Sequence, residues 1–527
     1  MAQLLIPYAL VFRIISFLLF ASLTGFGQSF RRIELPIQGN PTSYNLMPLK
    51  EKGFILANMT EQRVLQVSKY DSLLTQVWQL ETDIEPGFNY IDQYADDTHV
   101  FLLFGNRSGD QFTLVRIAGF LGAIQKTRLT SLRNFELNQF RVIQNTIYLA
   151  GVVKSEPVLI SYALGQNTPK ILNSGLGKNA NLQSIEAIDE NLLLTYSIRE
   201  KKYATLVLRE ITADGKVVKQ TPIKPKDNFS LFTGKIFPTG ENSFLIGSYG
   251  YGGTNTNSRN NAQTLGIYIA RIGGINGIQS MEYLPFSDFK NFFNYLPNRQ
   301  KGRVERSVEK QKGRGNSYTV TSHVFVHDVL ETEKGFSLVA EIFTPEYVSN
   351  YNNFGMMSPF SPFWGSPFAM SPFYRNYWGF NSWAWNPWLM GSPGNAQTFN
   401  GFRYTHGIVV GFDQNGKRQY DYSVVYENLR LFELQEKLSV SIREGKQLAA
   451  YTKQNELIIN EFSDEEQQNR QRIFDIVTGK EKERIKETTF ENTAHWFDNY
   501  FLAWGIQKIA SSTERNRQVF YVHRIKY

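Results

Sequence analysis

The segment DENLLLTYSIREKKYATLVLREITADGKVV, residues 189–218, contains one unit of a pattern that recurs along the chain. A turn-forming cluster leads into a short apolar run, an alternating run follows, and Asp214-Gly215 precedes Val217-Val218. Short apolar runs between turn residues are typical of buried strands, and Asp-Gly favours the positive φ angles of tight hairpins. The segment therefore predicts antiparallel strands that are joined by hairpins.

The apolar run occurs eight times. Five of the seven intervals between successive runs are 45 to 53 residues long, whereas the other two are 92 and 112 residues and need insertions. Four antiparallel strands in about 40–50 residues is the repeat size of a β-propeller blade. The runs are FILA (54–57), VFLL (100–103), IYLA (147–150), LLLT (192–195), FLIG (244–247), FSLV (336–339), LAAY (448–451) and FLAW (501–504).

The first and last strands of the pattern complement each other. Residues 519–527, VFYVHRIKY, match a third strand with no fourth strand after it, and residues 31–37, RRIELPI, form a strand without a blade of its own. An N-terminal strand that completes the last blade would close a ring and remove two exposed edges. We therefore predict an all-β fold, a single eight-bladed propeller over residues 28–527. Seven blades, or a pair of smaller β-domains, are the alternatives.

Composition supports a globular β-protein. The 527 residues exceed the roughly 250–300 that one core usually holds, which favours a repetitive architecture. Apolar residues make up 42% of the chain and aromatic residues 14%, and Phe and Tyr favour strands. The chain has no cysteine, which excludes disulfides and thiolate metal sites. Its net charge of +8 is dispersed, so we expect weak attraction to anionic surfaces and no nucleic acid partner.

The N-terminus has the features of a secretory signal peptide. Residues 4–23 are mainly apolar with Arg13 as their one charge, and small residues precede Gln28. Residues 1–27 are therefore expected to be a signal peptide that is cleaved after Gly27, with an uncleaved membrane anchor as the alternative. The protein would then be periplasmic, associated with an outer membrane, or extracellular.

Two stretches resemble known proteins. The unit IYIARIGGINGIQSMEYL (267–284) resembles the loose repeats of bacterial β-propellers, and GFGQ (25–28) resembles the signal-peptide ends of Bacteroidota envelope proteins. The resemblance implies an exported propeller. The chain lacks the motifs of WD40, kelch and sialidase blades. The resemblance therefore implies an architecture and no particular activity.

The 92-residue interval contains a Gly/Asn-rich stretch (249–263) and a basic segment, residues 287–317, that we expect to be an insertion loop. The segment has seven positive charges and two negative ones, Glu305 and Glu309, so it could bind phosphates or acidic glycans. A solvated loop is the alternative, because no aromatic residue lies among the charges to stack on bases. The charges are Arg299, Lys301, Arg303, Arg306, Lys310, Lys312 and Arg314.

The 112-residue interval contains a second insertion loop, residues 346–403. Between 354 and 393 it has thirteen aromatic residues, six prolines and one charge, Arg375. Such proline density excludes a long helix or a central strand. We expect this loop to fold over the propeller, to contact a protein partner, or to enter a membrane interface. The expected partner-binding residues are Phe360, Phe363, Trp364, Phe368, Phe373, Trp378, Trp383, Trp385 and Trp388.

The chain shows no motif that specifies a reaction. No nucleophile elbow, phosphate loop or metal motif is present, and no cofactor or metal is expected. His323 and His327 would lie about 13 Å apart on one strand, too far to bind one metal. The sequence thus favours a non-catalytic binding or scaffolding subunit of an envelope assembly that contacts its partner through the aromatic loop. A glycan-active or other hydrolytic enzyme with its site at the channel mouth, and a peripheral membrane protein, are the alternatives.

Overall fold

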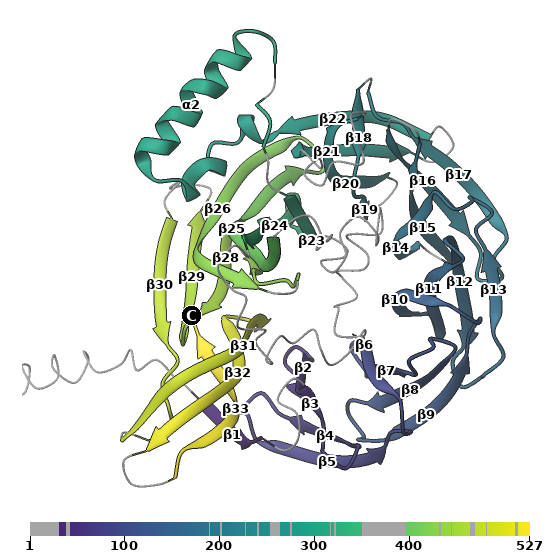
Figure 1. Cartoon of the computed structure of the whole chain (residues 1–527), viewed down its shortest axis with the longest axis vertical. Coiled ribbons are helices and arrows are strands. Elements are labelled where there is room, and N and C mark those ends of the chain that lie inside the picture. Colours follow the sequence, from purple (N-terminus) through teal and green to yellow (C-terminus); the bar gives the residue numbers. More distant parts are fainter. Residues whose placement is uncertain are drawn as a thin grey trace, which may run out of the picture.

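The computed structural model describes residues 31–37, 43–188, 190–200, 203–226, 228–239, 242–252, 264–273, 277–316, 318–320, 323–349, 397–431, 434–443, 445–463, 469–480, 482–511 and 515–527. Within these residues the strands form eight antiparallel sheets, which are arranged in a ring (Figure 1). Each sheet is one blade of a β-propeller, and we number the blades in chain order. The predicted all-β fold with eight blades is therefore confirmed.

Blades 1 to 4 follow one another without insertions between them. Their strands are β2 (Asn45–Pro48), β3 (Phe54–Met59), β4 (Val64–Tyr70) and β5 (Gln76–Asp83) in blade 1; β6 (Asn89–Ala95), β7 (His99–Gly105), β8 (Gln111–Ala118) and β9 (Ile124–Thr130) in blade 2; β10 (Glu136–Ile143), β11 (Thr146–Val153), β12 (Glu156–Ala163) and β13 (Lys170–Asn173) in blade 3; and β14 (Ala180–Ile188), β15 (Asn191–Arg199), β16 (Ala204–Ile211) and β17 (Val217–Ile223) in blade 4.

Blades 5 to 8 include both insertions and the closing strand. Their strands are β18 (Phe229–Leu231), β19 (Lys235–Thr239), β20 (Asn242–Tyr251), β21 (Thr264–Gly273) and β22 (Gly277–Pro285) in blade 5; β23 (His323–Thr332), β24 (Gly335–Ser349), β25 (Gln397–Asp413) and β26 (Arg418–Leu431) in blade 6; β27 (Ser439–Arg443), β28 (Lys446–Lys453), β29 (Glu456–Ser463) and β30 (Asn469–Asp475) in blade 7; and β31 (Glu483–Phe497), β32 (Tyr500–Ser511), β33 (Arg517–Lys526) and β1 (Arg31–Pro36) in blade 8.

The eight apolar runs all lie in the second strand of a blade, taken outward from the ring centre, where β18 and β19 of blade 5 both pair with β20. These strands are β3, β7, β11, β15, β20, β24, β28 and β32. The second strand has a hydrogen-bonded neighbour on each side, and its faces pack against the blades before and after it. Such a strand needs apolar residues on both faces, which is why these runs do not alternate. The repeat in the sequence is therefore the repeat of this buried position.

Closure of the ring follows the sequence prediction. β1 pairs antiparallel with β33, with Ile33 opposite Val522, and becomes the outermost strand of blade 8. The Arg32 side chain donates hydrogen bonds to Gln507 Oε1 at 2.7 Å and Glu34 Oε1 at 2.7 Å. Blade 8 then contacts blade 1, where Trp496 Nε1 donates to the carbonyl oxygen of Gly53 at 2.9 Å.

The hydrophobic core is divided among the blade interfaces. In the described residues, eight clusters of buried apolar side chains each join two consecutive blades, and one of them joins blade 8 to blade 1. Contacts between neighbouring blades, rather than one central core, therefore stabilise the ring.

The basic segment 287–317, expected as a loop, instead contains two 3-10 turns, η2 (Phe286–Asp288) and η3 (Phe292–Tyr295), and the helix α2 (Asn298–Lys312). The helix lies outside the ring (Figure 1). It forms because Val304 and Val308, four residues apart, pack against the core between blades 5 and 6, and because Lys301 and Glu305 form an (i, i+4) ion pair at 3.8 Å. The contact of Val304 and Val308 with this core therefore explains why the segment is a helix rather than a loop.

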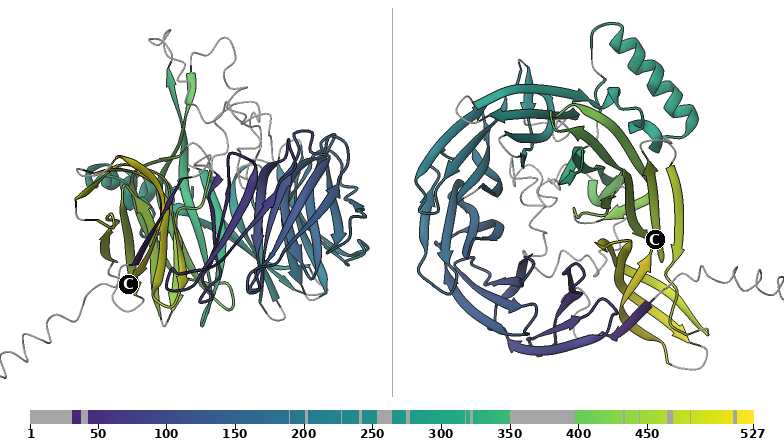
Figure 2. Two further views of the ribbon diagram at one scale, coloured as in Figure 1. Left: turned by 90° about the horizontal axis from the view of Figure 1, so that it is seen from below. Right: turned by 180° about the vertical axis from the view of Figure 1, so that it is seen from behind.

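The flanks of the second insertion are also ordered differently from the expected loop 346–403. β24 continues to Ser349 and β25 begins at Gln397, so the two strands extend as one hairpin beyond a face of the ring (Figure 2). The nine aromatic residues expected to bind a partner, from Phe360 to Trp388, lie outside the described residues, as do residues 1–27. None of the helices described is long and apolar enough to cross a membrane.

Candidate functional site

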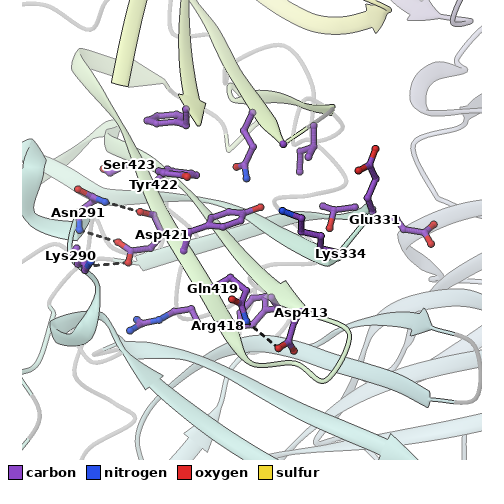
Figure 3. Close-up of a pocket in the computed structure, with 18 of the residues that line it drawn as sticks. Lys290, Asn291, Glu331, Lys334, Asp413, Arg418, Gln419, Asp421, Tyr422 and Ser423 are labelled. Carbon is purple, nitrogen blue, oxygen red and sulfur yellow. Dashed lines mark hydrogen bonds between the residues drawn. The ribbon is translucent and has the colours of Figure 1, made fainter. Parts of the chain in front are cut away.

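A pocket of about 960 Å³ lies between blades 6 and 7, at the ends of β24 and β25 that are opposite the extended hairpin (Figure 3). The turns β23–β24, β25–β26 and β27–β28 line it, together with the segment that contains η2 and η3. β23 and β27 are the innermost strands of their blades, so the pocket reaches from the inner turns to the outer edge strand β26.

Three aromatic rings form one wall of the pocket. The rings of Tyr420 and Tyr422 on β26 stack with centroids 4.9 Å apart, and the ring of Tyr422 stacks on Phe462 of blade 7 at 4.5 Å. Tyr420 lies across Gly411, where a Cβ atom would come within 2.0 Å of its Cζ. The Tyr420 hydroxyl then reaches Ser337 Oγ at 2.7 Å. The absence of a side chain at Gly411 therefore leaves the space in which this ring lies.

The opposite wall is attached to β26 by one buried carboxylate. Asp421 accepts hydrogen bonds from the backbone N–H of Lys290 at 3.3 Å and of Asn291 at 2.9 Å, and its carbonyl oxygen accepts one from Asn291 Nδ2 at 2.7 Å (Figure 3). These bonds fix the segment between η2 and η3 beside the strand. Asp421 is thus a structural residue, and its oxygens are occupied.

Charged side chains of both signs surround the aromatic wall. Glu331 at the end of β23 and Glu333 and Lys334 in the turn after it are exposed. Within the described residues none of the three forms an ion pair or a side-chain hydrogen bond. Lys290 is also exposed. The Arg418 guanidinium lies 5.0 Å from the centre of the Phe289 ring.

The remaining charges that line the pocket are already paired. Asp413 accepts hydrogen bonds within its own turn, Asp288 pairs with Lys312 at 2.5 Å, and Arg443 pairs with Asp498 at 3.1 Å. Within the described residues, Lys290, Glu331, Glu333 and Lys334 are therefore charged groups that remain available to a ligand.

This combination of groups is suited to a polar ligand that has an apolar face. Sugar rings present C–H groups that pack on aromatic rings and hydroxyls that bond to carboxylates, ammonium groups and amides. No histidine is among the described residues that line the pocket, so the base of a Ser-His-Asp triad is missing there. The described part of the chain contains no group of three or more His, Cys, Asp or Glu side chains that could hold a metal ion.

The sequence-predicted residues lie outside this pocket. The seven basic residues of 299–314 lie on α2 and just after it, and two of them contact the pocket wall, Lys301 through Asn294 and Lys312 through Asp288. His323 and His327 lie on the innermost strand β23 and are both buried. Sequence reasoning missed Tyr420 and Tyr422, although their spacing of two residues on a strand would have placed both on one face.

A second polar cluster is fully buried between blade 6 and the segment before blade 7. Glu341 accepts hydrogen bonds from the Tyr426 hydroxyl at 2.6 Å and from the Lys437 backbone N–H at 2.9 Å, and His327 Nε2 lies 3.4 Å from its carboxyl. Burial raises the pKa of Glu341 to about 7, and burial lowers the pKa of Lys437 to about 8. Lys437 Nζ donates to the carbonyl oxygen of Glu491, so the cluster connects blade 6 to blade 8.

No family model and no curated protein matches the sequence. Solved structures match the fold. Oligopeptidase B from Leishmania major is 8% identical with a TM-score of 0.39, covering 90% of this chain and 54% of its own. The polysaccharide lyase Uly1 is 11% identical with a TM-score of 0.38, and the match covers 94% of this chain and 99% of the lyase. A puromycin-hydrolyzing peptidase from Mycobacterium tuberculosis is 7% identical with a TM-score of 0.38, and the match covers 82% of this chain and 53% of the peptidase. The chain spans about half the length of the peptidases.

The expected non-catalytic scaffolding subunit has no counterpart among the structures named here, which are peptidases and a polysaccharide lyase, and that expectation is not supported. At these identities the likeness concerns the fold alone. The class of protein is thus an eight-bladed β-propeller, and any activity has to be inferred from the pocket.

Proposed function

We propose that the protein is an exported glycan-active enzyme that hydrolyses a glycosidic bond in the pocket between blades 6 and 7. The observation that carries the proposal is the combination, in one pocket of about 960 Å³, of a fixed aromatic wall with carboxylates that have no partner in the described residues. The saccharide packs against the ring of Tyr420, and Glu331 and Glu333 act as the acid and base.

The positions of the two glutamates along the chain allow the spacing that this chemistry needs. They are two residues apart, so their Cα atoms are separated by no more than about 7 Å. Glycoside hydrolysis uses two carboxyl groups that are about 5–9.5 Å apart, one to protonate the leaving oxygen and one to activate water or attack the sugar. A pocket that lacks a histidine base but has two carboxylates therefore favours glycoside hydrolysis over hydrolysis of a peptide bond by a serine nucleophile.

The test is release of reducing ends from a panel of purified polysaccharides by the wild-type protein, followed by the same assay on E331Q and E333Q. Loss of a general acid or base lowers the rate by about 10²–10⁴-fold. E61Q replaces an exposed glutamate in blade 1, far along the chain from the pocket, and serves as the control.

Y420A tests the aromatic wall separately. It should raise KM for the saccharide more than it lowers kcat, because the ring binds the substrate and takes no part in proton transfer. The proposal fails if no polysaccharide is cleaved, if E331Q and E333Q both keep wild-type rates, or if the products carry the double bond of an elimination.

A further inference from the structure

Helix α2 carries a row of positive charges on its solvent-facing side. Arg299, Arg303, Arg306 and Lys310 are spaced by four, three and four residues, so on a helix of 3.6 residues per turn they fall within a stripe about 60° wide. Val308, which is buried against the propeller, projects to the opposite side. We call these four residues the basic stripe; it is about 17 Å long.

The basic stripe is available to a ligand. All four side chains are exposed, and within the described residues none of them pairs with a carboxylate. The other two cations of the helix contact the pocket wall instead, because Lys301 donates to Asn294 Oδ1 at 2.8 Å and Lys312 pairs with Asp288. Cations on one side of the helix attach it to the pocket, and the cations of the stripe face solvent.

The stripe and the pocket belong to one continuous segment. Asp288, Lys290, Asn291 and Asn294 line the pocket, and the stripe begins five residues later at Arg299. A chain that leaves the pocket over this wall reaches α2, and the cations of the stripe are about one helical turn apart on the side of α2 that faces away from the propeller. Lys290 is an exposed cation at the start of that path.

We propose that the basic stripe binds the part of a linear acidic polysaccharide that extends beyond the pocket, so that the substrate class of the enzyme is a carboxylated or sulfated glycan. This inference rests on the proposed function and specifies its substrate. An array of like charges complements a polymer with repeated anionic groups. Nucleic acid is disfavoured because no aromatic ring lies between the charges, and a membrane surface because the exposed face of α2 has no apolar side chain to insert.

The test compares two variants with the same loss of charge. R299Q/R303Q/R306Q/K310Q removes the stripe, whereas K178Q/K216Q/K224Q/R484Q removes four exposed cations from blades 4 and 8 and the segments beside them. Thermal unfolding of both proteins first shows that they are folded. Binding to polygalacturonate, heparin and neutral dextran is then measured at low and at high salt.

Loss of the stripe should weaken binding to polygalacturonate or to heparin by about 30-fold at low salt, because four exposed ionic contacts disappear, and the control should change by less than about threefold. High salt should remove the difference. Equal binding by the two variants, preference for dextran, or tighter binding to double-stranded DNA or phosphatidylserine vesicles would overturn the inference.

Failure of the inference differs from failure of the proposed function. If a neutral glycan is cleaved and acidic glycans are not bound, the stripe does not bind glycans, but the proposed hydrolase function is supported. If acidic glycans bind through the stripe and none is cleaved, the hydrolase proposal fails while the binding surface remains.

Discussion

Acidification should destabilise the propeller through four buried histidines, His323, His327, His406 and His523. Burial lowers their pKa values to about 4, 3, 3 and 4. At His523 burial is the main cause: the positive charge of Arg32, whose Nη1 lies 3.0 Å from His523 Nε2, lowers the pKa further, and the Val477 carbonyl oxygen 3.2 Å from the same nitrogen raises it. Below the pKa of 6.5 of an unfolded histidine, protons therefore bind the unfolded chain and not the folded one.

The magnitude follows from these pKa values. Between pH 7 and pH 5.5 each buried histidine lowers the free energy of unfolding by a little more than about 1 kcal/mol, and four of them by about 5 kcal/mol. Glu341 acts in the opposite direction. Its raised pKa of about 7 makes the folded state take up a proton over the same range, which raises the free energy of unfolding by about 2 kcal/mol. The net loss is about 3 kcal/mol, with uptake of about three protons on unfolding at pH 5.5.

The assay is urea unfolding followed by tryptophan fluorescence at both pH values. Calorimetry in buffers of different ionisation enthalpy counts the protons. H406F keeps the stack on Tyr295, whose ring lies 4.7 Å away, and should reduce the loss by about 1 kcal/mol. E341Q should increase the loss. Equal stability at pH 7 and pH 5.5, or no proton uptake, would refute the assignment of neutral buried histidines.

Three other outcomes are expected. G411A should displace the ring of Tyr420 and lower stability by about 1–3 kcal/mol, and saccharide binding should fall more than for an alanine placed elsewhere in the blade; unchanged binding would mean that the ring is not part of the site. Deletion of β1 (Arg31–Pro36) should expose the edge of β33 and cause association in size-exclusion chromatography, whereas a monomer as stable as wild type would contradict closure by this strand. Expression with secretion should give a protein whose mass corresponds to a first residue at Gln28; an intact N-terminus would contradict cleavage.

The fold could be predicted from the sequence because one strand of each blade, the second from the ring centre, is buried on both faces. The runs at 54–57 and 501–504 look alike since both are second strands, in blades 1 and 8. Closure was readable because the segments 31–37 and 519–527 each lacked a partner along the chain. A strand without a neighbour has unpaired backbone groups, and pairing these two segments satisfies the backbone groups of both.

Helix α2 and the pocket were not readable in the same way. The many charges of α2 obscured the pair Val304 and Val308, whose contact with the core stabilises the helix. The pocket wall needs Tyr422 from blade 6 beside Phe462 from blade 7, a contact that depends on how two blades pack. The position of Tyr420 further depends on the missing side chain of Gly411, and spacing along the chain does not reveal that close approach.

The pairing of β1 with β33 has a consequence for how the protein is made. The outermost strand of blade 8 is synthesised before any other part of the ring, and its partner is synthesised after seven complete blades. Until then β1 has to remain unpaired, and blade 1 lacks the contact of Trp496 with Gly53. A circular permutant that joins the two ends beside blade 8 and opens the chain in the β17–β18 connection would make these strands neighbours during synthesis, and should fold with less aggregation into the same ring.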